Sequence, residues 1–92
     1  MNLEEFEIIR KIKRSTAEIC KYEKELAKQE KLSAENQLLA RRLGLDKNAE
    51  SQALRATEEA AASSMRSKIA EMKLAHNKFA IEHGYNGEVL PE

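Results

Sequence analysis

RRLGLDKN, residues 41–48, contains the first glycine of a 92-residue chain that has no proline before Pro91. Two arginines and a leucine precede Gly44, and cations followed by a residue free to adopt a positive φ are typical of a helix end. The side-chain oxygens of Asp46 and Asn48 are both suited to cap the first amides of a following helix. The stretch therefore predicts one helix ending, a tight connection over residues 44–48 and a second helix beginning.

The sequence on both sides of this turn favours long helices. Residues 3–43 are rich in Glu, Lys, Leu, Ala, Gln and Arg, and residues 49–83 contain many alanines and neither Gly nor Pro. Gly84 repeats the stop signal, so we expect residues 84–92 to form a flexible tail. A helix of this length needs a partner helix along it. The chain is therefore predicted to be a single all-α domain of two long antiparallel helices, a helical hairpin.

Apolar residues at heptad spacing indicate where the two helices pack. Ile12, Ile19 and Leu26 recur every seven residues, as in a left-handed supercoil. Past Gln29 we expect the stripe to shift to the leucines that follow. The residues assigned to the packing seam of the hairpin and its oligomer are Ile8, Ile12, Ile19, Tyr22, Leu26, Leu32, Leu39, Leu54, Met65, Ile69, Met72, Leu74, Phe79 and Ile81. Folding about residue 46 is expected to pair Ile19 with Leu74, Ile12 with Ile81 and Leu32 with Ala61.

The second helix carries two nearly opposite faces of small and apolar residues. One contains Leu54, Ala61, Met65, Ile69, Met72, His76, Phe79 and His83; the other contains Ala56, Ala60, Ser67, Ala70, Leu74 and Ile81. A two-helix hairpin buries only one face of each helix. We therefore expect the chain to self-associate, most simply as two hairpins forming a four-helix bundle.

Composition narrows the classes of function. The 16 Lys and Arg residues balance 16 Asp and Glu residues, whereas a nucleic-acid-binding domain is normally basic. The apolar runs are far too short to span a membrane, and a single cysteine suits a reducing compartment, so we expect a cytoplasmic protein. No phosphate loop, nucleophile elbow or paired-carboxylate pocket is recognisable. These features favour a non-catalytic protein without a cofactor.

Three groups of residues nevertheless carry reactive or charged side chains. His76 and His83 are two helical turns apart, about 10 Å, too far for one metal ion unless a second chain contributes. Cys20 lies beside Lys21, whose charge favours a thiolate. The simpler interpretation is that Cys20 is a small apolar side chain at the edge of a helix. The remaining group is a basic cluster, Arg10, Lys11, Lys13 and Arg14, which follows three glutamates and is interpreted as a solvated face.

The stretch Leu39–Leu54 resembles the helix-turn-helix motif of DNA-binding regulators. Ala40 matches the small residue between the helices, Gly44 the turn glycine and Leu45 the apolar turn residue, whereas Glu50 replaces an apolar packing residue. The resemblance implies a DNA-reading surface made of Arg41, Lys47, Asn48, Ser51, Gln52 and Arg55.

Two classes of function follow from the sequence. The favoured one is a protein-protein interaction module, such as a small adaptor, assembly factor or protein inhibitor, that binds itself and another protein through its helix faces. The alternative is a transcriptional regulator that uses residues 39–55 to bind DNA. A third class, a helical oligomer that binds a small molecule between its subunits, rests on no specific residue.

Overall fold

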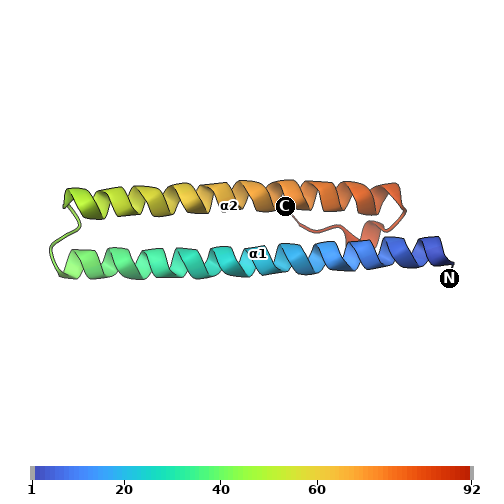
Figure 1. Ribbon diagram of the computed structural model, residues 1–92, viewed down its shortest axis with the longest axis horizontal. Helices are drawn as coiled ribbons and strands as arrows, with labels where there is room; N and C mark the ends of the chain where they lie inside the picture. The colour runs from blue at the N-terminus through green and yellow to red at the C-terminus, as the bar shows by residue number, and fades with distance from the viewer. Residues whose placement is uncertain (1, 92) are drawn as a thin grey trace.

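Two long helices lie side by side in opposite directions and form a hairpin (Figure 1). The computed structural model describes residues 2–91. Helix α1 spans Leu3–Arg42, helix α2 spans Ala49–Glu82, and a short 3-10 turn, η1, spans Asn86–Glu88. The predicted all-α hairpin is thus confirmed, and each helix ends one residue earlier than the sequence indicated.

Local sequence signals set the ends of both helices. The side-chain oxygen of Asn2 accepts a hydrogen bond from the Glu5 amide, and that of Asn48 accepts one from the Glu50 amide, each at 2.8 Å. Asn48, not Asp46, is therefore the cap of α2. These side chains satisfy amides that have no partner within their helix.

Gly44 and Gly84 both end a helix in the left-handed conformation, with φ of 71° and 81°. After α1, the Leu45 amide donates to the Ala40 carbonyl at 2.8 Å and the Gly44 amide donates to Arg41 at 3.1 Å. This pair of hydrogen bonds defines the Schellman motif, and the same pattern follows α2.

Gly44→Ala is expected to destabilise the fold by about 1 kcal/mol, because a Cβ atom disfavours positive φ. Apart from Gly44 and its two chain neighbours, no residue has an atom within 4 Å of the position that this Cβ would occupy, so the cost is conformational. Gly87→Ala is the matched control, because Gly87 is equally open and has no positive φ. Chemical denaturation of the two variants measures the difference, and equal midpoints would contradict the assignment of the turn.

The buried core is concentrated in the terminal half of the hairpin, residues 2–28 and 66–91. Ile12, Ile19, Ile69, His76 and Ala80 are buried there. Predicted seam residues that are partly buried are Ile8, Tyr22, Leu26, Met65, Met72 and Phe79. The isoleucines at heptad spacing therefore pack as the sequence indicates.

Five of the residues assigned to the seam do not pack between the two helices. Leu32, Leu39, Leu54, Leu74 and Ile81 are all more than half exposed. The expected register about residue 46 agrees with the contacts between the helices, such as Glu23 with Lys73 and Ser15 with His76. The expected pairs Ile19–Leu74, Ile12–Ile81 and Leu32–Ala61 are nevertheless not buried pairs of the seam, because Leu74, Ile81 and Leu32 are more than half exposed.

For Leu32 and Leu39 the reason is that the heptad seam of α1 does not shift after Gln29. It continues from Leu26 through Ser33 and Ala40, each seven residues further on, and these residues with Gln37 are partly buried. A supercoiled hairpin keeps the same heptad positions facing the partner helix along its length. The leucines beyond Gln29 occupy other positions and face solvent.

The hairpin is long and thin, with principal extents of 63 × 17 × 15 Å. Its radius of gyration is 18.8 Å, compared with about 12 Å for a compact domain of this length. Its accessible surface is 7226 Å², compared with about 5,400 Å² for a typical folded chain of this mass. A single hairpin therefore leaves an unusually large part of its surface in water.

Candidate functional site

The C-terminal segment folds back along the hairpin and is anchored there by His76. Figure 1 shows this segment returning from the end of α2 toward the middle of the molecule. His76 is buried, and its Nε2 lies 2.8 Å from the Glu88 carbonyl oxygen while its Nδ1 lies 2.9 Å from Ser15 Oγ. In the neutral tautomer that fits both contacts, Nε2–H donates to Glu88 and Nδ1 accepts from the Ser15 hydroxyl. One imidazole thus joins α1, α2 and the tail.

The side chain of Asn77 binds the main chain of the same C-terminal segment. Its Nδ2 donates to the Leu90 carbonyl at 2.9 Å, and its Oδ1 accepts from the Leu90 amide at 2.8 Å. Residues 85–91, for which the sequence predicts a flexible tail, are thus docked at two points along α2; residue 92 lies outside the described residues. The sequence interpretation missed Asn77, because no local pattern marks a side chain that binds backbone groups 13 residues away.

Asn77→Ala is expected to detach the tail while leaving the hairpin folded. Two hydrogen bonds of about 1 kcal/mol each hold Leu90, so the tail should open at least about tenfold more often. Hydrogen exchange at the Leu90 amide measures this opening, and Lys78→Ala, a change at an exposed neighbour, is the control. An unchanged Leu90 exchange rate in Asn77→Ala would show that the anchor lies elsewhere.

The two histidines do not come together as a metal site. Both ring nitrogens of His76 have partners in Ser15 and Glu88, while Nδ1 of the exposed His83 lies 2.9 Å from the Phe79 carbonyl oxygen of its own helix. Cys20 is exposed on α1. Within residues 2–91, no three His, Cys, Asp or Glu side chains are grouped in a way that could hold a metal ion.

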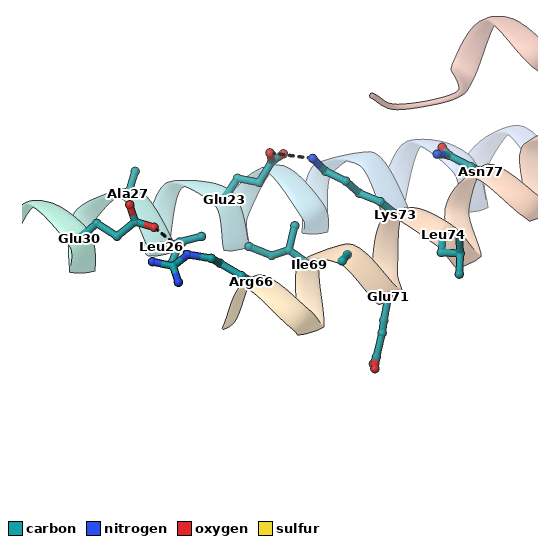
Figure 2. Close-up of a pocket in the computed structure, with 11 residues that line it drawn as sticks. Glu23, Leu26, Ala27, Glu30, Arg66, Ile69, Glu71, Lys73, Leu74 and Asn77 are labelled. Carbon is teal, nitrogen blue, oxygen red and sulfur yellow. Dashed lines mark ion pairs between the residues drawn. The ribbon is translucent and has the colours of Figure 1, made fainter. Parts of the chain in front are cut away.

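Ion pairs join the two helices along one edge of the hairpin. Lys73 Nζ lies 3.2 Å from Glu23, and Arg66 Nε lies 3.6 Å from Glu30 (Figure 2). Arg66 also donates to Glu59 at 3.2 Å. The hydrogen bond to Glu59, and then the charges of both glutamates, raise the pKa of Arg66, which is protonated at physiological pH in any case. Apart from the largely covered Lys73, the side chains of these pairs are about half exposed or more, so the pairs add little stability.

Beside these ion pairs runs a groove of about 620 Å³. Its apolar lining is Leu26, Ala27, Ile69, Ala70 and Leu74. Figure 2 shows Ile69 directed toward α1, whereas Leu74 and Glu71 project from the opposite side of α2. The groove is therefore continuous, through Leu74, with the outer face of α2.

The opposite edge of the terminal half has cation–aromatic contacts. Lys11 Nζ lies 4.3 Å from the centre of the Phe79 ring, and Lys68 Nζ lies 4.3 Å from that of Tyr22. Lys68 also donates to the Tyr22 hydroxyl at 3.2 Å. Lys11 of the predicted basic cluster thus covers an aromatic ring of the seam. The other members, Arg10, Lys13 and Arg14, are exposed.

The turn half of the hairpin, residues 29–62, is packed quite differently. Its seam is made of small and polar residues such as Ser33, Gln37 and Ala40, and Ala62 is its one buried residue. Six leucines of this half, hereafter the turn-half leucines, are 45–62% exposed: Leu32, Leu38, Leu39, Leu43, Leu45 and Leu54. Exposed apolar side chains gathered over one region mark contact surfaces.

The residues implied by the helix-turn-helix resemblance lie at the tip of the hairpin. Arg41, Lys47, Asn48, Gln52 and Arg55 are exposed and Ser51 is half-buried. The side-chain oxygen of Asn48 is engaged in capping α2. The helices on either side run antiparallel (Figure 1), whereas those of a helix-turn-helix cross at about 90–120°. The tip thus differs in geometry from the motif that its sequence resembles.

Comparison with known proteins finds no matching protein-family model, no similar curated protein and no similar solved structure. Among residues 2–91, no helix combines the length and the apolar character needed to cross a membrane.

Proposed function

We propose that this chain is a non-catalytic protein-interaction module that self-associates and presents helix faces to another protein. The observation that supports the proposal is the exposure of large apolar side chains on two separate surfaces. One is the set of turn-half leucines, and the other is the outer face of α2, where Leu74 is 67% and Ile81 is 56% exposed. Monomeric proteins rarely leave such patches uncovered.

The exposed area is large enough for stable association. The surface exceeds that of a compact chain by about 1,800 Å², and each partner of a standard-size interface buries roughly 800 Å². Two hairpins can therefore pair and leave one apolar surface on each. We propose that this second surface, the turn-half leucines, contacts a different protein, as an adaptor, assembly factor or inhibitor does.

The dependence of the melting temperature on protein concentration tests whether the chain self-associates. If only the associated hairpin is fully stable, its melting temperature rises by several degrees between about 2 μM and 200 μM chain, because mass action favours the assembled form. Circular dichroism at 222 nm measures the melt. A melting temperature that is the same at both concentrations would contradict self-association.

The alternative proposal is that the tip of the hairpin binds DNA. The salt dependence of binding to DNA distinguishes this proposal from the protein-interaction module. Phosphate contacts by Arg41, Lys47 and Arg55 would weaken at least about tenfold between 50 and 200 mM salt. Replacing Arg41, Lys47 and Gln52 together with alanine would then abolish binding to a selected DNA sequence. We expect the triple variant to self-associate as strongly as the wild type, because none of the three replaced side chains belongs to the apolar surface proposed for self-association.

A further inference from the structure

A line of residues at heptad spacing follows the outer face of α2. It consists of Ala53, Ala60, Ser67, Leu74 and Ile81, hereafter the outer line of α2. All five are exposed, on the side of the helix away from the buried Ile69 and His76. The line remains exposed although the tail is docked at the neighbouring Asn77. It is thus a second packing seam for which the single chain has no partner.

We propose that the outer line of α2 binds the same line of a second copy, with the two α2 helices antiparallel and Ser67 at the two-fold axis. This inference rests on the proposed function and names the partner and the face. It follows from how side-chain size is distributed along the line, which is small toward the turn and large toward the tail.

The antiparallel arrangement matches a large residue with a small one at four of its five levels. Ile81 packs against the partner's Ala53, Leu74 packs against the partner's Ala60, and Ser67 meets the partner's Ser67. The summed side-chain volume is therefore similar at these four levels and smaller only at the central pair of serines, so the two helices approach most closely at the two-fold axis and are separated equally toward both ends.

A parallel pair does not have this property. It would place Leu74 and Ile81 against the same residues of the partner at one end, and alanine against alanine at the other. The helices would then have to diverge toward the tail, or leave voids toward the turn, and both lose packing energy. Antiparallel pairing also places the two tips at opposite ends, so that each copy keeps its turn-half leucines free.

Disulfide trapping tests the arrangement directly. In a Cys20→Ser background, Ser67→Cys should form an intermolecular disulfide in a glutathione buffer, because the two-fold axis brings the two Cα atoms within the range of about 4.4–6.8 Å that the bond requires. Ala60→Cys should not cross-link, because its two copies would be 14 residues, or about 21 Å, apart along the axis. Ala61→Cys, on the edge that faces the turn-half leucines, is the matched exposed control.

The outcomes separate this inference from the proposed function. Cross-linking of Ser67→Cys alone supports antiparallel pairing of the outer lines. Cross-linking of both Ser67→Cys and Ala60→Cys would overturn it in favour of parallel pairing. Cross-linking of Ala61→Cys alone would also overturn it, while leaving self-association in place through the other edge. A monomeric protein with no cross-link would overturn both.

Exchanging large and small residues provides a second test. Ala60→Leu creates a clash with the partner's Leu74, and Leu74→Ala creates a cavity opposite the partner's Ala60. Since each change occurs twice in a dimer, each should weaken dimerisation at least about tenfold. The double variant restores one large and one small residue at each level, so its affinity should return to within about threefold of the wild type. A double variant as weak as the two single changes combined would contradict the pairing. Alanine and leucine are both strong helix formers, so helicity should be the same in all four proteins.

Discussion

Ile19→Asp is expected to leave the chain unfolded at 25 °C. Ile19 is 1% exposed and is the largest fully buried side chain among the described residues. An aspartate there places a carboxylate without a partner in the seam, at a cost of several kcal/mol. The whole stability of a small domain is only about 5–15 kcal/mol, so at the lower end of this range the cost is as large as the stability itself. Far-ultraviolet circular dichroism should show the loss of helix.

Lys24→Asp is the control for this change. It introduces the same side chain five residues further along α1, at an exposed position. We expect a melting temperature close to that of the wild type. If Ile19→Asp also melted like the wild type, the seam of the hairpin would be misplaced.

His76→Ala is expected to have the second largest effect, about 2–4 kcal/mol of lost stability. The substitution empties a buried position that is 4% exposed, and it removes the partner of both Ser15 and the Glu88 carbonyl. The tail should detach together with the loss of packing. Chemical denaturation measures the first effect, and hydrogen exchange of the tail measures the second.

Two further variants separate the effect of lost packing at His76 from the effect of its lost hydrogen bonds. His76→Phe retains an aromatic ring but neither hydrogen bond, so it should release the tail with a smaller loss of packing. His83→Ala removes an exposed histidine that bonds only within its own helix, and should cost less than about 1 kcal/mol. Equal effects of His76→Ala and His83→Ala would contradict the anchoring role of His76.

The sequence predicts the helices and the turn well, because the signals involved are local. A glycine at positive φ and an asparagine cap act on the residues next to them, so Gly44, Gly84 and Asn48 could be interpreted without knowledge of the fold. The isoleucine repeat was informative for a similar reason. Ile12 and Ile19 occupy equivalent heptad positions, and both are buried.

The turn half could not be predicted from apolar spacing. The leucines of this region form a separate apolar stripe. The seam passes through Ser33 and Gln37, which are polar and so are not part of an apolar pattern. Supercoil geometry, which keeps every seventh residue at the interface, decides between the two. Leu32 and Leu39 therefore lie on the surface of the single chain and not in its core.

The docked tail was missed for a different reason. Asn77 and His76 bind main-chain atoms of Leu90 and Glu88, and carbonyl and amide groups are the same in every residue. No sequence pattern identifies such a contact. Ser15, a polar interruption of the apolar seam, was the one available indication, since a polar residue at a seam position requires a partner such as His76.

Sedimentation equilibrium of the wild-type chain at micromolar concentration tests the central claim most directly. If the hairpin completes its packing with a second copy, the measured mass is twice the 10.5 kDa of the chain and decreases toward one chain only on dilution. A single species of 10.5 kDa at every concentration, with a cooperative thermal transition, would contradict the claim and show that the elongated hairpin is stable alone.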